Sequence, residues 1–357
     1  MLLLAAIPVI GMSVSYWGAV DGKPVDRIRL ENRRGMSVVL SDYGAMINAV
    51  VVPDRTGHVA NVALGFGALP TYESTSHRYG GVIGRYAGRI DHAGFALDHH
   101  MVHLTPGRNG VTLHGGPVGY DRRVWSHELF SDHEALGVTF RLLSPAGDQR
   151  FPGRLAISVT YRLAERQNAL TIIYTAQTDA PTVVNLTNHV FFNLAGAGAS
   201  GLAGQRFEIA ANRYVEIDRR KIPDGRLPRV AGTRFDFLQP REIQGSLRSG
   251  GYDVTLVFTR WTGMVARVAT VVDSTSGRQL DVYTTEPAMQ FNSGTGFDGE
   301  SVGSEGHAYR SGDGFSLETE HLPDSPNRPA FPSTVVRPGT PYRSETRFVF
   351  SIAPSGG

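Results

Sequence analysis

The chain has 357 residues, of which 41% are hydrophobic, so it can bury a large core either as one big β domain or as two domains of ordinary size. Its 35 Lys and Arg against 33 Asp and Glu leave a formal charge of +2, which gives no reason to expect binding to nucleic acid or to an anionic membrane. The absence of cysteine excludes disulfides, thiolate nucleophiles and Cys-ligated metal centres.

The N-terminal stretch from Leu2 to Met12, LLLAAIPVIGM, is apolar and is followed by small residues. It resembles the apolar part of a secretory signal without its basic start, and it is too short to span a bilayer. Residues 1–15 are therefore interpreted as a signal-like segment or as a first strand, and both a cytoplasmic and an exported location stay open. No later stretch is long and apolar enough to predict a membrane helix.

Short alternating or β-branched runs recur along the chain, whereas long helical periodicity is hard to find. The 42 glycines and 20 prolines fit many turns between short strands. Strands are predicted at 27–30, 37–40, 45–52, 137–142, 155–163, 169–175, 254–258, 265–272, 279–284 and 346–351. This pattern predicts an all-β sandwich or barrel of antiparallel sheets. No linker or repeat divides the chain, so one domain is expected, with loops at 196–204 and, exposed and mobile, at 293–313.

Two arginines interrupt the glycine-rich, apolar stretch YGGVIGRYAGRI. A structural ion pair is the preferred interpretation of Arg85. Arg89 is a candidate to hold a ligand oxygen through its fixed fork of donors, with a structural role as an equal alternative.

His99 and His103 have the spacing HxxxH beside Asp98. That spacing brings two rings together only on a helix, and FALDHHMVHL is typical of a strand or hairpin, where residues four apart lie more than ~13 Å from each other. A surface hairpin is predicted here, and no metal site.

Two other histidines are candidates for a binding or catalytic site. His114 lies in LHGG, whose glycines would let the backbone approach a ligand closely, although a turn residue is the plainer interpretation. His189 lies in TNHVFFNL, where the amides of Asn185, Asn188 and Asn193 could fix its imidazole ring. Imidazole titrates near neutrality, so a held histidine can donate a proton. A hydrogen-bonded structural histidine is the alternative.

The second half of the chain adds four polar candidates. Asp253 follows a glycine turn and is either a turn former or an acceptor for ligand hydroxyls. Gln290, in TTEPAMQF, is either an amide that bridges strands or a site residue. Glu318 stands in GFSLETEH on a predicted strand, where partial burial would raise its pKa toward that of a useful general base, with a salt-bridged glutamate as the alternative. Glu320 shares its face by alternation, and is either a second site carboxylate or exposed to solvent.

These residues stand in an ordered series of motifs that resembles the aldose 1-epimerase family, also called galactose mutarotases, from Tyr16 to near the C-terminus. A single motif would be weak evidence, whereas the ordered series is specific. The motifs are NVALGF, VIGRYAGRI, LHGGPVGYDRRVW, VNLTNHVFFNLAG, IPDG, GTRFDF, GYD, VYTTEPAMQF and GFSLETEHLPDSPNRPAFPS.

The resemblance implies a single domain at 16–357 with a large antiparallel β-sandwich, no metal or organic cofactor, and interconversion of the α and β anomers of hexoses such as glucose and galactose. By similarity, Glu318 would be the base that takes the proton from the anomeric hydroxyl, and His189 the acid that protonates the ring oxygen. Arg89, His114, Asp253 and Gln290 would bind sugar oxygens. The expected partner is a small-molecule hexose, with no nucleic acid and no membrane, and the chain is expected to be a monomer or a homodimer.

The chain departs from the family pattern at several places near these motifs. Gly88 stands where the family often has Asn, and Val190 and Phe191 replace Ser and Tyr of NHSYFNL. GYDHN becomes GYDVT with Val254 and Thr255, and LETQ becomes LETE with Glu320. These changes bear on sugar preference more than on the type of reaction.

Three other functions compete with the epimerase. A noncatalytic carbohydrate-binding β-sandwich would be favoured by loss of the acid or the base, and both are present. A glycoside hydrolase needs two carboxylates, for which Glu318 and Asp253 are the only nominees. A related sugar-phosphate epimerase needs extra cationic groups to hold the phosphate.

Overall fold

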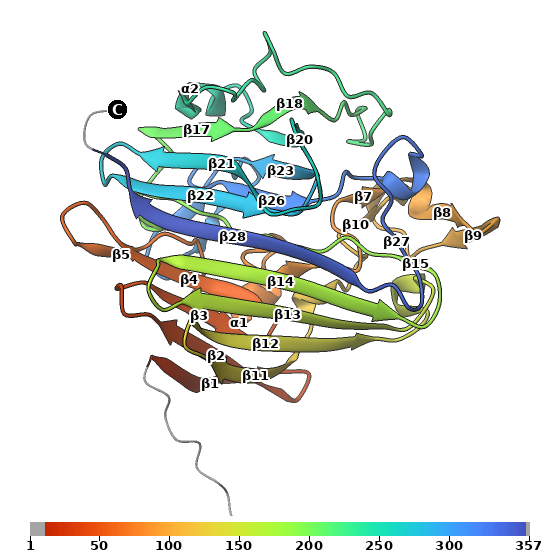
Figure 1. Ribbon diagram of the computed structural model, residues 1–357, viewed down its shortest axis with the longest axis horizontal. Coiled ribbons are helices and arrows are strands. Elements are labelled where there is room, and N and C mark those ends of the chain that lie inside the picture. Colours follow the sequence, from red (N-terminus) through yellow and green to blue (C-terminus); the bar gives the residue numbers. More distant parts are fainter. Residues whose placement is uncertain (1–10, 355–357) are drawn as a thin grey trace, which may run out of the picture.

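The computed structural model describes residues 11–354, which fold almost entirely into strands (Figure 1). The larger layer is an antiparallel sheet of nine strands, and all ten strands predicted from the sequence are present in the molecule. In spatial order, this sheet contains β11 (Ser126–Ser131), β12 (Ala135–Ser144), β13 (Leu155–Ala164), β14 (Ala169–Thr178), β28 (Tyr342–Ile352), β22 (Arg278–Thr284), β21 (Ala266–Asp273), β17 (Gln205–Ile209) and β19 (Arg241–Glu242).

Two smaller antiparallel sheets lie against this layer, one at each half of it (Figure 1). The five-stranded sheet contains β1 (Met12–Val20), β2 (Lys23–Glu31), β3 (Ser37–Ser41), β4 (Met46–Pro53) and β5 (Val59–Asn61). The four-stranded sheet contains β18 (Ala211–Tyr214), β20 (Asp253–Phe258), β23 (Ala288–Asn292) and β26 (Ser316–Glu320). One continuous hydrophobic cluster joins all three sheets, which confirms the predicted all-β sandwich.

Short elements complete the described part of the chain. Five two-stranded ladders pair β6 (Val82–Ile83) with β16 (Thr187–Asn188), β7 (Arg89–Ile90) with β10 (Thr112–Leu113), β8 (Gly94–Leu97) with β9 (His100–His103), β15 (Thr182–Val183) with β27 (Val335–Val336), and β24 (Asp298–Val302) with β25 (Ala308–Arg310). The two α-helices of the described residues are α1 (Leu69–Ser74) and α2 (Gln244–Leu247). Within residues 11–354, no helix has the length and hydropathy needed to cross a membrane.

The C-terminal strand β28 ties the two halves of the chain together. It pairs with β14 on one side and with β22 on the other, so it lies in the middle of the nine-stranded sheet (Figure 1). The single domain over 16–357 stays a prediction, which this pairing supports. The interpretation of residues 1–15 falls mostly outside the described residues, and only its last positions belong to strand β1.

The predicted exposed loop at 293–313 is wrong. The segment contains the β24–β25 hairpin, and two of its aromatic side chains, Phe297 and Tyr309, are buried. Phe297 stacks on Tyr79 with 5.2 Å between the ring centroids. The few apolar residues of this segment are large aromatic ones, and their burial holds a hairpin that its Gly-rich composition does not suggest.

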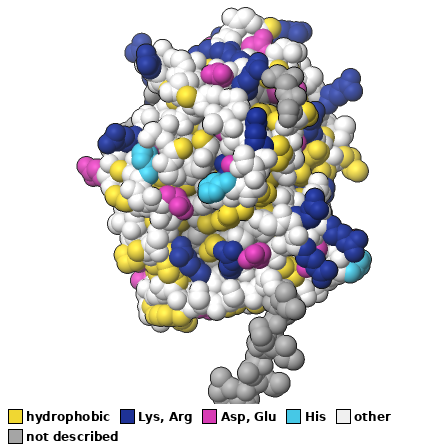
Figure 2. Space-filling model, turned by 90° about the vertical axis from the view of Figure 1, so that its left-hand side faces the viewer, with side chains coloured by type: hydrophobic (Ala, Val, Ile, Leu, Met, Phe, Trp, Pro, Cys, Tyr) yellow, Lys and Arg dark blue, Asp and Glu magenta, His cyan; other side chains and the backbone are white. Residues whose placement is uncertain are grey.

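The surface agrees with the near balance of charges in the sequence. On the face that Figure 2 shows, basic and acidic side chains are spread among uncharged ones and do not gather in one patch. The β8–β9 hairpin carries His99 and His103 as exposed side chains, which confirms the predicted surface hairpin.

Phe348→Ala tests the joint between the halves of the sandwich. Phe348 of β28 is 2% exposed and packs edge-on against Phe192, at 5.2 Å between centroids. We expect the free energy of unfolding to fall by about 3–5 kcal/mol in one cooperative transition, measured by urea denaturation. Leu143→Ala, at a position 55% exposed on β12, is the control and should cost less than about 0.5 kcal/mol. Equal effects of the two changes would contradict this account of the core.

Candidate functional site

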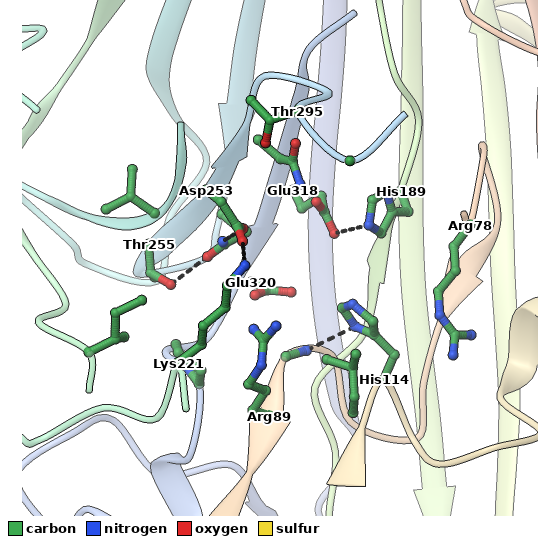
Figure 3. Close-up of a pocket in the computed structure, with 18 of the residues that line it drawn as sticks. Arg78, Arg89, His114, His189, Lys221, Asp253, Thr255, Thr295, Glu318 and Glu320 are labelled. Atoms are coloured by element: carbon green, nitrogen blue, oxygen red, sulfur yellow. Dashed lines mark hydrogen bonds and ion pairs between the residues drawn. The ribbon is translucent and has the colours of Figure 1, made fainter. Parts of the chain in front are cut away.

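A cavity of about 590 Å³ lies where the four-stranded sheet faces β7, β10 and the segment that follows β16. Its walls bring together side chains that are far apart in the sequence (Figure 3). All six predicted site residues line it: Arg89, His114, His189, Asp253, Gln290 and Glu318.

Strand register places the carboxylates and amides on one wall. Thr255 of β20 pairs with Gln290 of β23, and Gln290 pairs in turn with Glu318 of β26, so the three stand in one row across the sheet. Residues two apart along a strand share a face. Asp253 and Glu320 therefore point to the same side as this row, and both line the cavity.

Glu318 and His189 face each other at the cavity. The distance between Glu318 Oε2 and His189 Nε2 is 3.5 Å, and the two side chains are 2% and 11% exposed. The other carboxylate oxygen, Oε1, accepts a hydrogen bond of 2.9 Å from the hydroxyl of Ser316. This bond fixes the carboxyl group and leaves Oε2 directed toward the imidazole.

Burial shifts the pKa values of this pair in opposite directions. The pKa of Glu318 is raised to about 8, mainly by desolvation and also by the charge of Asp253, against the hydroxyl of Ser316 and the charge of Arg89. Desolvation lowers the pKa of His189 to about 4, with the charge of Arg78 acting the same way. These shifts favour a neutral carboxyl group on Glu318 and a neutral imidazole on His189 near neutral pH, so that the pair holds a single proton.

The backbone, and not the neighbouring amides, holds His189 in place. Its N–H donates to the carbonyl of Gly81 and its carbonyl accepts from the N–H of Gly80, so it continues the β6–β16 ladder. Its ring packs on Phe191, at 5.0 Å between centroids. The prediction that the amides of Asn185, Asn188 and Asn193 fix the ring is wrong, because these amides donate to backbone carbonyls instead.

His114 is held as a neutral donor. Its ring atom Nδ1 accepts a hydrogen bond of 3.2 Å from the N–H of Gly88, and its backbone N–H donates to the Gly88 carbonyl at 2.9 Å. Burial lowers the pKa of His114 well below its ordinary value, and the charges of Arg78 and Arg89 add to the effect. With Nδ1 accepting, the proton of the neutral ring is on Nε2, where it can be donated to a ligand oxygen.

Asp253 and Gln290 form a second hydrogen-bonded group. Gln290 Nε2 donates to Asp253 Oδ1 at 2.7 Å, and the hydroxyl of Thr255 donates to Gln290 Oε1 at 2.6 Å. Lys221 Nζ contacts Asp253 Oδ2 at 2.6 Å. Burial would raise the pKa of Asp253, but the hydrogen bond and charge of Lys221 outweigh it and hold that pKa below its ordinary value. Asp253 is therefore a carboxylate that can accept hydrogen bonds.

Arg89 brings an uncommitted cation into the cavity. Its carbonyl accepts from the N–H of Asp324, which anchors the backbone, while the guanidinium group points toward the carboxylates (Figure 3). Among the described residues, its side chain makes no ion pair shorter than 4.0 Å. Its donors are free to bind ligand oxygens.

The family of proteins described as aldose 1-epimerase matches residues 26–349 of this chain. The chain belongs to the aldose 1-epimerase family. It is 38% identical over 337 residues to galactose mutarotase from Rattus norvegicus, with 93% of this chain and 96% of that protein covered. It is also 38% identical over 343 residues to aldose 1-epimerase from Escherichia coli K12, with 93% and 97% covered.

Solved structures agree with this membership. The aldose epimerase homologue from C. elegans superposes with a TM-score of 0.84 at 28% identity, covering 92% of this chain and 99% of that one. Galactose 1-epimerase from Lactobacillus acidophilus, at 24% identity, shares the fold with a TM-score of 0.85 and covers 96% and 99%.

Several residues of this epimerase cavity were not predicted from the sequence. Arg78 borders the two histidines and forms an ion pair with the buried Asp121, and Lys221 reaches Asp253 from a turn. A lone cation beside YGG or IPDG carries no signal that sets it apart from surface charge. Aromatic and apolar side chains also line the cavity, among them Phe191, Tyr214, Phe235, Val254 and Phe297. Val190 lies instead in the main core.

Arg85 is structural, as preferred, but it does not form the predicted ion pair. It is 2% exposed, and in the described part of the chain no carboxylate lies within 4.0 Å of its guanidinium. Nη1 donates to the carbonyls of Pro152 and Gly153, and Nη2 donates to the hydroxyl of Ser144. Carbonyl oxygens of a tight turn satisfy this cation in place of a charge.

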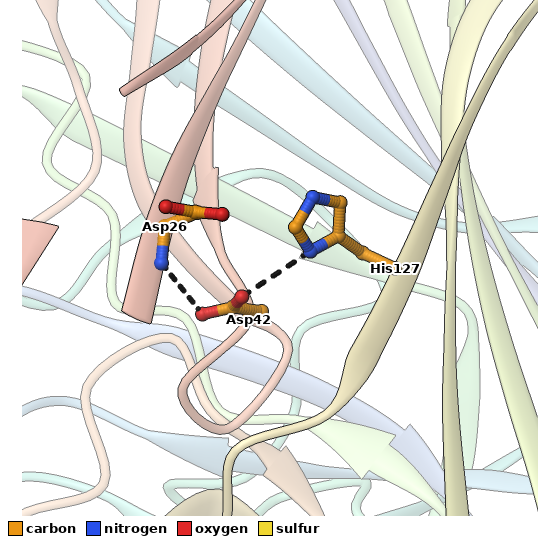
Figure 4. Close-up of side chains that lie close together, drawn as sticks. All are labelled: Asp26, Asp42 and His127. Carbon is orange, nitrogen blue, oxygen red and sulfur yellow. Dashed lines mark hydrogen bonds and ion pairs between the residues drawn. The ribbon is translucent and has the colours of Figure 1, made fainter. Parts of the chain in front are cut away.

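A second cluster of titratable groups lies away from the cavity (Figure 4). The potential ligand atoms of Asp26, Asp42 and His127 are within 4.8 Å of one another. Asp42 accepts from the N–H of Asp26 at 2.9 Å, and its other oxygen lies 3.2 Å from His127 Nδ1. The hydrogen bond to Asp42 raises the pKa of His127. His127 thus ties β11 to the β2–β3 pair through Asp42, and a protonated ring there has two carboxylates beside it as counter-ions.

The tautomer of His114 can be checked directly. We expect long-range ¹H–¹⁵N spectra to show a neutral ring with its proton on Nε2 at pH 6, because burial and Arg78 disfavour the cation and Gly88 occupies Nδ1. The spectrum of a His114→Gln variant assigns the signal. A ring that is cationic at pH 6, or that carries its only proton on Nδ1, would refute this assignment.

Proposed function

We propose that this chain is an aldose 1-epimerase that interconverts the α and β anomers of hexoses such as D-glucose and D-galactose. It is an isomerase of carbohydrates. The observation that carries the proposal is the pairing of Glu318 and His189 at 3.5 Å on the wall of the cavity. The ring oxygen and the anomeric oxygen of a hexose are bonded to the same carbon, so the groups that exchange protons with them must lie close together.

In the proposed reaction, Glu318 acts as the base and His189 as the acid in breaking one bond of the sugar ring. Sugar hydroxyls that bind the Glu318 carboxyl favour its ionised form, and its proton passes to Nε2 of His189. Glu318 then takes the proton of the C1 hydroxyl while His189 protonates the ring oxygen, and the C1–O5 bond breaks to give the free aldehyde. Rotation about C1–C2 and the reverse transfers close the other anomer and restore both groups.

The remaining groups of the cavity hold the sugar while C1 turns. Arg89 and His114 donate hydrogen bonds to sugar oxygens, and the carboxylate of Asp253 accepts hydrogen bonds from sugar hydroxyls. Gln290 and Lys221 hold that carboxylate in place by donating to it. Firm contacts at the distant hydroxyls with freedom at C1 keep the reacting atoms within reach of Glu318 and His189.

The alternatives fit the cavity less well. A noncatalytic carbohydrate-binding protein has no need for a carboxyl and an imidazole that face each other with shifted pKa values. A sugar phosphate needs free cations. Two of the cavity's cations, Arg78 and Lys221, are already paired with Asp121 and Asp253.

The activity is tested by polarimetry with fresh α-D-glucose or α-D-galactose, whose approach to anomeric equilibrium the protein should accelerate. Glu318→Gln and His189→Asn should each lower kcat/KM by about 10²–10⁴-fold, because each removes one proton transfer but keeps a polar side chain that is no larger. Glu128→Gln, on the exposed edge strand β11, is the control and should keep full activity. No acceleration by folded wild-type protein would refute the epimerase proposal, and full activity of either pocket variant would refute its assigned role.

The pH dependence follows from the single shared proton. We expect kcat/KM to be level between about pH 4 and pH 8 after subtraction of the spontaneous reaction. Below about pH 4, His189 takes a second proton and the pair has no base; above about pH 8, Glu318 loses its proton and the pair has no acid. A profile that instead rises through pH 6.5, as for an ordinary imidazole, would contradict the shared-proton account.

A further inference from the structure

Glu320 is a second buried carboxyl group of the cavity that the proposed reaction does not use. It lies two residues after Glu318 on the same face of β26, it is 2% exposed, and it lines the cavity. Within residues 11–354, its Oε2 is buried without a hydrogen-bond partner. Burial of a polar atom without a partner is costly, so an atom of this kind inside a cavity indicates a place for a ligand.

The groups around Glu320 favour its neutral form. Glu318 lies near it on its own strand, and Arg89 reaches toward it from β7 (Figure 3). Glu286, in the turn before β23, acts on it as well. Burial raises the pKa of Glu320 well above its ordinary value, the charges of Glu318 and Glu286 raise it further, and Arg89 opposes them. Glu286 is itself paired with His321, at 2.5 Å between Oε2 and Nδ1. A neutral carboxyl offers both a donor and an acceptor.

Gly88 leaves the space beside this carboxyl open. A Cβ atom at position 88 would lie 3.3 Å from Pro323 and 3.6 Å from Glu320 Oε1, so any larger side chain would grow into the region that Glu320 borders. The φ angle of Gly88 is +79°, a conformation that Asn also tolerates. Gly88 and Glu320 are therefore neighbours in space.

We infer that Glu320 is a specificity-determining residue: as a neutral carboxylic acid, it exchanges hydrogen bonds with one sugar hydroxyl in the space that Gly88 leaves open. The inference rests on the proposed function. Two residues along a strand advance by about 6.6–6.8 Å, which is comparable to the span of a hexopyranose together with its hydroxyl groups. With C1 at Glu318 and His189, Glu320 thus meets a hydroxyl on a distant part of the ring, where it affects binding and not proton transfer.

The test compares Glu320→Ala, Glu320→Gln and Gly88→Asn with the wild type by polarimetry on glucose, galactose and their monodeoxy derivatives. Glu320→Ala should raise KM about tenfold with little change in kcat, because one hydrogen bond to the sugar is lost. Glu320→Gln should recover most of that loss, since an amide also donates and accepts. Gly88→Asn should raise KM by filling the space beside the carboxyl.

The deoxy sugars identify the hydroxyl. One derivative should bind the wild type about tenfold more weakly than its parent sugar does, and Glu320→Ala should not weaken its binding further. Each of the other derivatives should still lose affinity when Glu320 is replaced by Ala, as the parent sugar does. Thermal unfolding of each variant excludes misfolding, and Glu128→Ala is the control outside the cavity. If Glu320→Ala does not fold, the binding of the deoxy sugars to Glu320→Gln and Gly88→Asn decides whether Glu320 contacts a sugar hydroxyl.

Three results separate the possible failures. Unchanged KM in every Glu320 variant would overturn the inference and leave the epimerase proposal standing. A loss with Glu320→Gln as large as with Glu320→Ala would show that an ionised carboxylate is needed, which also overturns it. An inactive wild type would refute the proposed function itself.

Discussion

Burial of two carboxyl groups on one face of strand β26 is the constraint on which the site depends. Glu318 and Glu320 are both 2% exposed, burial raises the pKa of each, and the charge of Glu318 disfavours the ionisation of Glu320 further. Because water is largely excluded, protons stay on these groups at a pH where exposed glutamates have lost them. The same burial keeps His189 neutral, so proton exchange between the two proposed catalytic groups is available near neutral pH.

The β-sandwich holds the side chains of the cavity in place through the hydrogen-bonded ladders between its strands. The row Thr255, Gln290 and Glu318 is a consequence of strand register, and a slip by one residue would turn all three side chains away from the cavity. Across the cavity, the β7–β10 ladder positions Arg89, and the hydrogen bond from the backbone N–H of His114 to the carbonyl of Gly88 continues it. Sheets hold these positions more rigidly than loops would.

Much of the fold and of the site was predictable from local pattern. The ten predicted strands are long β-branched or alternating runs, which single sequences indicate well. The hairpin at 298–310 was missed because its stability comes from the distant Tyr79, which packs on Phe297. Arg78 and Lys221 were missed for a similar reason, since their importance comes from the side chains that they meet, Asp121 and Asp253.

The sequence by itself determined the all-β class, the family and the residues Arg89, His114, His189, Asp253, Gln290 and Glu318, because residue type and order along the chain carry that information. Only the tertiary structure decided how these residues act. The protonation of Glu318 and His189, the tautomer of His114 and the proximity of Gly88 to Glu320 depend on burial and on neighbours more than 20 residues away along the chain. Electrostatic and packing energies depend on distance in space, and sequence separation does not report it.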